Sequence, residues 1–277
     1  MAKTQTPPTA DHLDQILRLE QRRRGRLWWA RRWVAVGVAI AILIATVRTT
    51  EINLWELVTG LPRLGSWVTR SWPPDLSELP NFMVAIWETL AIALLGTGCA
   101  MVLAFPLSLL IARNLTPATA IALPLRGLLN LLRGIDTAIF ALFFVAVVGL
   151  GPFAGMLGVA FHTTGSMAKL YAEVLETLPP EPIEAIEVTG CDRLRTFSFA
   201  VLPEALPGLV GISLYLWEFN VRSSVILGIV GAGGIGYELL VSLKLLDFGR
   251  LATILGLILI MVSAIDWLSA QLRRRLS

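Results

Sequence analysis

Long runs of apolar residues follow one another along almost the whole chain and limit its fold more than any other feature. Of the 277 residues, 55% are hydrophobic and only 16% are charged, whereas soluble domains carry about 25% charged residues. A run of about 20 apolar residues is long enough to cross a bilayer as a helix. We therefore expect an all-α, polytopic membrane protein rather than a soluble enzyme, a disordered chain or a disulfide scaffold.

The apolar runs predict six membrane crossings. They lie at about 29–48, 83–112, 119–149, 152–178, 200–219 and 250–270. A seventh run, 223–243, contains five glycines, too many for a straight helix that faces lipid. We interpret it as a re-entrant or broken element that lines the protein interior, where irregular backbone can be hydrogen-bonded. Without it the number of crossings is even, so both ends of the chain lie on one side of the membrane.

Arginines gather at both ends of the chain. Residues 18–32 contain seven of them, interleaved with tryptophans, and 273–275 are all arginine. Cations that flank a crossing favour the cytoplasmic side, so both termini are predicted to be cytoplasmic. The predicted organisation is a basic cytoplasmic segment 1–28, a first transmembrane helix 29–48, a periplasmic segment 49–82, a core 83–270 and a cytoplasmic tail 271–277.

Polar and ionisable side chains interrupt several apolar runs, where such groups are costly unless they pair or face a cavity. Five of them lie in or near predicted crossings: Arg133, Asp136, Glu218, Asn220 and Arg222. His162, Ser166 and Lys169 share one helix face by their spacing. His162 and Ser166 leave an intramembrane hydrolase open as one alternative. A secondary transporter of a small anion, with a buried carboxylate, is another.

Residues 231–236 match the pattern G-x-G-x-x-G, which occurs in dinucleotide-binding sites. Such a site needs a parallel βαβ unit and an acidic residue about 20 positions downstream. The corresponding stretch, 251–257, is apolar apart from Thr253, so closely packed backbone is the better interpretation. Cys99 and Cys191 stand in different surroundings and predict neither a disulfide nor a metal site.

The polar stretch 179–198 predicts a structured cytoplasmic loop. Pro179 and Pro180 end the preceding helix, and 181–189 has the pattern of a short helix with acidic residues in its first turn. Gly190 would end that helix, and a second helical piece follows. A connector with this much structure favours the docking of a soluble partner.

This loop resembles the EAA loop of importer permeases of the ATP-binding-cassette (ABC) class, type I. Glu184-Ala185, Gly190 and the later Leu202-Pro203 match the pattern, whereas Ile186 stands where a second alanine is common. In that family the loop forms a coupling helix that fits a cleft in the ATPase subunit. The resemblance implies ATPase-coupling roles for Glu184, Ala185, Gly190, Asp192 and Arg193.

Further motifs narrow the resemblance to the phosphonate branch, which includes relatives for phosphite and hypophosphite. These motifs are 112–115, 133–135, 149–155, 169–173 and 218–222 followed by 231–236. The resemblance covers about 81–270. Asp136-Thr137 departs from the proline-glutamate pair expected after Ile135, which leaves the substrate subclass open.

The resemblance implies a permease subunit without catalysis of its own, located in the bacterial inner membrane. Its partners would be an ATPase dimer that holds ATP and magnesium, a second permease copy or paralogue, and a periplasmic solute-binding protein. No cofactor, metal or nucleic acid is expected in this chain. The implied path residues are Arg133, Asp136, His162, Glu218, Asn220 and Arg222. The implied gate, or scoop, near the outer mouth is formed by Gly231, Gly233, Gly234 and Gly236.

Overall fold

The first unit contains one long helix whose second half is apolar. The computed structural model describes residues 10–51, 54–115 and 119–275 and divides into two units, 1–65 and 66–277, which are described separately. In the first unit, α1 covers Ala10–Thr49, and its side chains from Arg31 onward are exposed. The Arg32 guanidinium lies 5.2 Å from the Trp28 ring centroid, a pairing suited to a membrane interface. α2 (Leu54–Arg70) follows.

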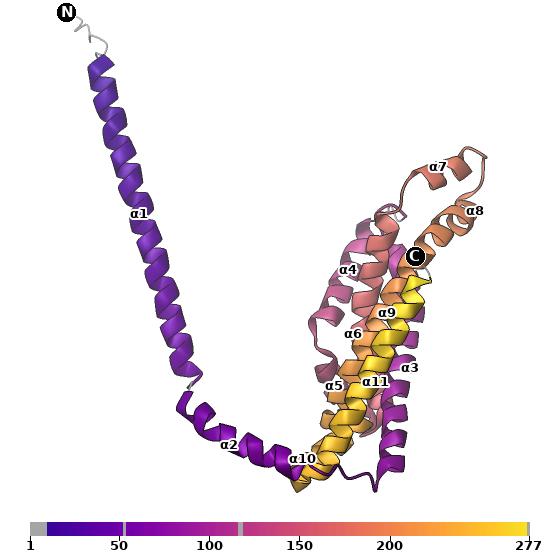
Figure 1. The fold of residues 1–277 in the computed structure, drawn as a ribbon. Coiled ribbons are helices and arrows are strands. Elements are labelled where there is room, and N and C mark those ends of the chain that lie inside the picture. Colours follow the sequence, from indigo (N-terminus) through magenta and orange to yellow (C-terminus); the bar gives the residue numbers. More distant parts are fainter. Residues whose placement is uncertain (1–9, 52–53, 116–118, 276–277) are drawn as a thin grey trace, which may run out of the picture. The chain divides into compact units, whose positions relative to one another are not determined.

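The second unit is a helical bundle (Figure 1). Its longer helices are α3 (Leu79–Ile111), α4 (Thr119–Gly134), α5 (Thr137–Val148), α6 (Pro152–Glu176), α9 (Leu202–Leu227), α10 (Ile235–Leu245) and α11 (Phe248–Arg274). The short helices α7 (Glu181–Glu187) and α8 (Arg193–Thr196) lie between α6 and α9, and π-helical turns at Phe197–Val201 and Gly228–Ala232 flank α9. Every regular element within the described ranges is a helix, so the predicted all-α class is confirmed.

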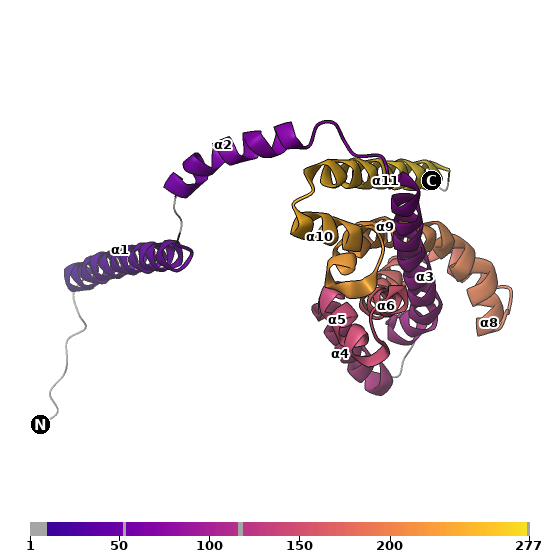
Figure 2. The same ribbon diagram turned by 90° about the horizontal axis from the view of Figure 1, so that it is seen from below.

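α6 is the central helix of the bundle. It packs against α3, α4, α5 and α9, and Figure 2 shows it between α3, α5 and α9. Met167, Tyr171 and Leu175 on α6 are fully buried. At Gly158 the approach to α5 is so close that a Cβ would stand 2.8 Å from the Ala141 nitrogen. Small residues on α6 thus let its neighbours pack closely, as in other membrane bundles.

Among the described residues, four helical segments are long and apolar enough to cross a membrane. They are Arg31–Thr49, Leu79–Ile111, Arg193–Ala232 and Phe248–Arg274. α4 and α5 together provide a fifth, bent by 90°. α6 has 25 residues, or about 37 Å of helix, which exceeds the roughly 30 Å of a hydrocarbon core. Its composition is more polar because other helices surround it. By length and composition the described helices therefore supply four crossings, or five with the bent pair, and the crossing at 152–178 stays a prediction.

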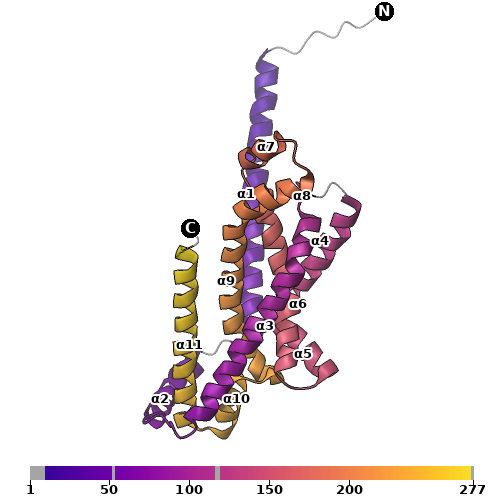
Figure 3. The same ribbon diagram turned by 90° about the vertical axis from the view of Figure 1, so that its right-hand side faces the viewer.

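The glycine-rich run that we interpreted as a broken element does contain a break. α9 continues to Leu227, the chain turns through 228–234, and α10 then runs for 11 residues. Such a helix is about 16 Å long, too short to cross a bilayer. Figure 3 shows α10 near one end of the bundle, and α7, α8 and the C-terminal end of α11 toward the other.

Candidate translocation path and coupling loop

The loop between α6 and α9 presents a short helix away from the bundle (Figures 1 and 3). The Pro180 carbonyl accepts hydrogen bonds from the backbone N–H groups of Ile183 and Glu184 (3.1 and 2.9 Å) and so starts α7. Glu181 and Glu184 lie in its first turn, where the helix dipole favours carboxylates. Glu184 and Ala185 are exposed, whereas Ile183 packs against a buried cluster of α6 and α9. One face of α7 is anchored and another is open.

One glycine and one cap shape the second half of the loop. α7 ends at Glu187, two residues earlier than predicted, and Gly190 has a φ of +76°, a conformation that glycine adopts without strain. The Asp192 carboxylate accepts a hydrogen bond from the Arg195 backbone N–H (3.1 Å) and caps α8. Arg193, the first residue of α8, is exposed. Glu184, Ala185 and Arg193 therefore face outward, while Gly190 and Asp192 shape the backbone.

Three of the predicted path residues, Arg133, Asp136 and His162, lie at the turn between α4 and α5. The Asp136 carboxylate accepts a hydrogen bond from the Ala138 backbone N–H (2.8 Å) and caps α5. His162 Nδ1 lies 2.8 Å from the Ile135 carbonyl oxygen, and it donates because a carbonyl only accepts. Arg133 is exposed at the end of α4. The turn is therefore held by polar contacts, and the exposed Arg133 side chain lies beside it.

Asn220 lies in the core rather than on an exposed wall. Its side chain is fully buried, and its amide nitrogen donates to the hydroxyl oxygens of Thr97 (2.8 Å) and Thr163 (3.0 Å). These bonds join α9 to α3 and α6. Because a buried polar group needs hydrogen-bond partners, this triad specifies how the three helices cross, and a role for Asn220 in the path stays a prediction.

Glu218 and Arg222 belong to an ion-pair network between α9 and α11. The Glu218 carboxylate contacts Arg222 on its own helix and Arg273 on α11, the latter at 3.2 Å. Arg222 also lies 3.6 Å from Asp266. Pairing lowers the cost of charges at membrane depth. In this arrangement both residues connect α9 with α11.

Three of the four predicted gate glycines lie in a loop with left-handed backbone, which α3 holds in place. Gly231, Gly233 and Gly234 have φ values of +97°, +79° and +72°, which other residues rarely adopt. The Gly234 N–H donates to the Glu88 carboxylate (2.7 Å), and the Ile235 N–H donates to the Thr89 hydroxyl (2.9 Å). The side chains of Glu88 and Thr89 on α3 thereby cap the start of α10.

Sequence reasoning missed Glu88 and Thr89. The signal was present, because Glu88 is the only charged residue in the apolar run 83–112. A lone carboxylate at membrane depth requires a partner, and here the partner is the backbone at the start of α10.

Comparison with known proteins places this bundle in a family. A family model described as "Binding-protein-dependent transport system inner membrane component" matches residues 104–277. The chain belongs to this family. The permease is therefore a multi-pass membrane component of an importer that works with a binding protein and an ATPase, as the EAA-like loop implied.

Similar proteins of known name are transport permeases. The permease is 43% identical over 244 residues to a protein named for phosphite transport, HtxC of Stutzerimonas stutzeri, covering 88% of this chain and 86% of the relative. It is 34% identical over 271 residues to the phosphite transport permease PtxC of the same species, covering 96% and 98%. The phosphate-import permease PhnE of Mycolicibacterium smegmatis is 39% identical over 242 residues, covering 87% and 45%. These names fit a transport subunit rather than an enzyme.

Solved structures show the same fold. The permease chain of an inward-facing MetNI methionine ABC transporter superposes with a TM-score of 0.63 at 24% identity, covering 73% of the permease and 99% of that chain. An amino acid ABC transporter crystallised with histidines gives 0.61 at 15% identity, covering 72% and 96%. The bundle of the second unit is thus the ABC importer permease fold.

At the α10 end of the bundle, one arginine joins three elements of the permease. Arg250 on α11 lies 2.8 Å from Glu78, which precedes α3, and 3.2 Å from Glu238 on α10. Its guanidinium carbon stands 5.5 Å from the centroid of the Phe82 ring. The segment before α3 is also bonded to α11, because the Thr253 hydroxyl donates a hydrogen bond to the Asp75 carbonyl (2.7 Å). We call this group the Arg250 cluster.

Asp75 makes the stability of the Arg250 cluster depend on pH. The Ser77 backbone N–H donates to its carboxylate (2.9 Å), and this bond, the Ser77 hydroxyl and the nearby Arg250 charge lower the Asp75 pKa. A lowered folded-state pKa stabilises the fold above the unfolded value of about 3.9, and this contribution disappears as pH falls through the folded value. In detergent, thermal unfolding should therefore show a larger loss of stability below about pH 4 for the wild type than for Asp75→Asn. Parallel pH profiles would contradict this linkage.

Proposed function

We propose that the permease imports a phosphorus oxyanion, namely a phosphonate, phosphite or hypophosphite, by alternating access driven by a partner ATPase. The observation that carries the substrate class is the identity of 43% and 34%, over most of the chain, to relatives named for phosphite transport. A relative named for phosphate import, at 39% identity, handles an ion with the same tetrahedral phosphorus centre.

In this proposal the ion passes the α4–α5 turn. An oxyanion that loses its hydration shell needs hydrogen-bond donors and positive charges in place of the water. Arg133 is exposed there, and His162 is held beside the same turn by Ile135. Asp136 is engaged in capping α5, so its charge is partly balanced by the start of that helix. Glu218, Asn220 and Arg222 are the further path residues of this proposal, and they also join α9 to α3, α6 and α11.

The ATPase would dock on the loop that carries α7 and α8. Two features of the loop support this docking. Glu184, Ala185 and Arg193 are exposed, and Gly190 and Asp192 shape the backbone between them. ATP and magnesium would be held by the ATPase, leaving this chain without cofactor or catalysis. The loop lies toward the same end of the bundle as the arginine-rich C-terminus (Figure 3), which supports a cytoplasmic position for both.

Two permease chains, as identical copies or paralogues, would enclose the path, and a periplasmic binding protein would deliver the ion at the opposite end. ATP binding closes the ATPase dimer, and α7 moves with it. That movement rocks the helices from inward-open to outward-open, and hydrolysis resets them. The loop at 231–236 would act as the outer gate, because its backbone is held by single hydrogen bonds to Glu88, Thr89 and Gly151.

The test is uptake by the reconstituted importer, with the permease, its ATPase and its binding protein in proteoliposomes that contain ATP. Labelled phosphite should accumulate only with ATP, and sulfate should not compete. Replacing Arg133 with glutamine should lower the uptake rate by about tenfold while the protein still assembles, because one charge-assisted contact is lost. Uptake that needs an ion gradient instead of ATP would favour a secondary transporter and contradict the proposal.

A further inference from the structure

α4 and α6 each carry a polar stripe, and the two stripes face each other. The α4 stripe is Arg126, Asn130 and Arg133, and the α6 stripe is His162, Ser166, Lys169, Glu173 and Glu176. Residues at these spacings share one helix face. The helices are antiparallel, because Arg126 pairs with Glu176 at one end and Ile135, just beyond α4, bonds to His162 at the other. We call the surface between the stripes the α4–α6 lane.

Acidic residues stand only at the two ends of the α4–α6 lane. Asp136 follows one end, and Glu173 and Glu176 lie at the other. The side chains between them are neutral or cationic and include Arg133 and Lys169. A charge pattern of this kind favours an anion in the middle of the lane and limits how strongly it is held at either end.

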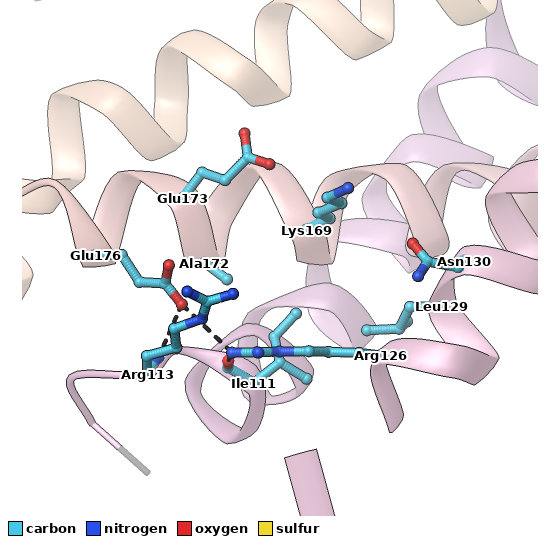
Figure 4. Close-up of a pocket in the computed structure, with 9 residues that line it drawn as sticks. All are labelled: Ile111, Arg113, Arg126, Leu129, Asn130, Lys169, Ala172, Glu173 and Glu176. Carbon is cyan, nitrogen blue, oxygen red and sulfur yellow. Dashed lines mark hydrogen bonds and ion pairs between the residues drawn. The ribbon is translucent and has the colours of Figure 1, made fainter. Parts of the chain in front are cut away.

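A pocket of about 240 Å³ opens where the lane meets the C-terminal end of α3 (Figure 4). Its polar lining consists of Arg113, Arg126, Asn130, Lys169, Glu173 and Glu176. In Figure 4 the two arginines gather around Glu176, while Lys169 and Asn130 lie farther along the helices. The wall of this small cavity therefore carries three cationic side chains and two carboxylates.

One of these carboxylates is already engaged. The Glu176 Oε1 accepts a hydrogen bond from the Arg113 backbone N–H (2.8 Å) and lies 3.5 Å from Arg126 Nη2. Arg126 also donates to the Ile111 carbonyl, so its guanidinium is held at the pocket wall. Within the described residues, by contrast, no ion pair or hydrogen bond engages the Lys169 ammonium or the Arg113 guanidinium. These two cations are open to a ligand.

We propose that this pocket binds the tetrahedral oxyanion of a phosphorus compound at the inner end of the path, with Lys169 and Arg113 as cations and Asn130 as a neutral donor. The inference rests on the proposed function for the substrate class. The cavity is below the 300–1,000 Å³ typical of sites for drug-sized molecules, which suits a small ion with its water. A free phosphite or phosphate ion offers this chemistry, and so does the phosphate of an anionic lipid headgroup.

The test is equilibrium binding of labelled phosphite to the permease–ATPase complex in phosphatidylcholine nanodiscs, without binding protein. The Lys169→Gln variant should bind phosphite at least about tenfold more weakly, because a charge-assisted hydrogen bond is lost. Glu173→Gln should bind severalfold more tightly, since it removes a negative charge from the pocket. This gain in affinity cannot arise from misfolding.

A matched control uses Lys244 on α10, an exposed lysine outside the pocket. Lys244→Gln makes the same change of charge and should leave phosphite affinity unchanged. Equal affinity of the wild type and Lys169→Gln would overturn the inference, and so would an equal loss in Lys169→Gln and Lys244→Gln.

Nanodiscs that contain phosphatidylglycerol separate the two sources of the phosphate group. If this lipid weakens phosphite binding in the wild type but not in Lys169→Gln, a headgroup occupies the same pocket. If it has no effect, the pocket takes the free ion. Either result supports the site. If the wild type imports phosphite but its binding does not depend on Lys169, only this inference is overturned. If binding of phosphate depends on Lys169 but no import occurs, only the proposed function is contradicted.

Discussion

Reversing the charge of Glu184 to lysine is expected to abolish uptake and to weaken the permease–ATPase complex at least about tenfold. Glu184 is exposed in the first turn of α7, where the helix dipole favours a carboxylate and opposes an ammonium. The reversal therefore disturbs both the short helix and the surface that the ATPase is proposed to contact. Co-purification of the two subunits and ATP-dependent phosphite uptake measure the two effects.

A matched control for this change is Glu204→Lys. Glu204 is an exposed acid in the first turn of α9, so its reversal carries a similar helix-dipole cost but leaves the α7–α8 loop intact. It should retain most of the ATPase association. If Glu184→Lys co-purifies with the ATPase and transports as the wild type does, α7 is not the coupling helix.

Replacing Gly236 with alanine should destabilise the permease by about 3 kcal/mol and abolish uptake. A Cβ at this position would stand 1.8 Å from the Val225 carbonyl oxygen and 3.1 Å from the Gly228 Cα. Both neighbours are backbone atoms, one in the last turn of α9 and one at the start of the break, so a side-chain rotation cannot relieve the clash. Thermal unfolding in detergent and the yield of folded protein report the loss.

Gly211→Ala is the control for this substitution. Gly211 lies in the interior of α9, and a Cβ there would meet no atom within 4 Å. Alanine is preferred to glycine inside a helix by up to about 1 kcal/mol, so this variant should be as stable as the wild type or slightly more stable. An unchanged melting temperature for Gly236→Ala would show that α10 does not pack on the end of α9 in the membrane.

The sequence predicted the helices well because each depends on a local pattern. A run of apolar residues sets the length of a crossing, and the glycines at 228–236 mark a break. Asp192 and Gly190 shape the loop by interactions within a few residues. The resemblance of this loop to the EAA pattern was enough to identify the family that the match over 104–277 confirms.

The candidate path was harder to predict because partners distant in sequence define it. Glu218 and Arg222 have the residue types of a path, yet Arg273 and Asp266 of α11 engage them. Asn220 meets Thr97, which lies 123 positions earlier. No spacing rule within one helix reveals such pairings. Lys169 was recognised only as part of a polar face, and its place in a pocket depends on α3 and α4.

The sequence by itself determined that this protein is an all-α membrane permease with a structured, EAA-like loop between two of its helices, because hydropathy, glycine positions and the loop motif are properties of neighbouring residues. Only the tertiary structure decided which polar groups are paired and which remain open to a ligand. Glu88 meets the backbone of α10, Glu176 meets Arg126, and Lys169 faces the cavity. The reason is physical: the free energy of a charge at membrane depth is set by the groups that packing brings to it, not by its neighbours in the chain.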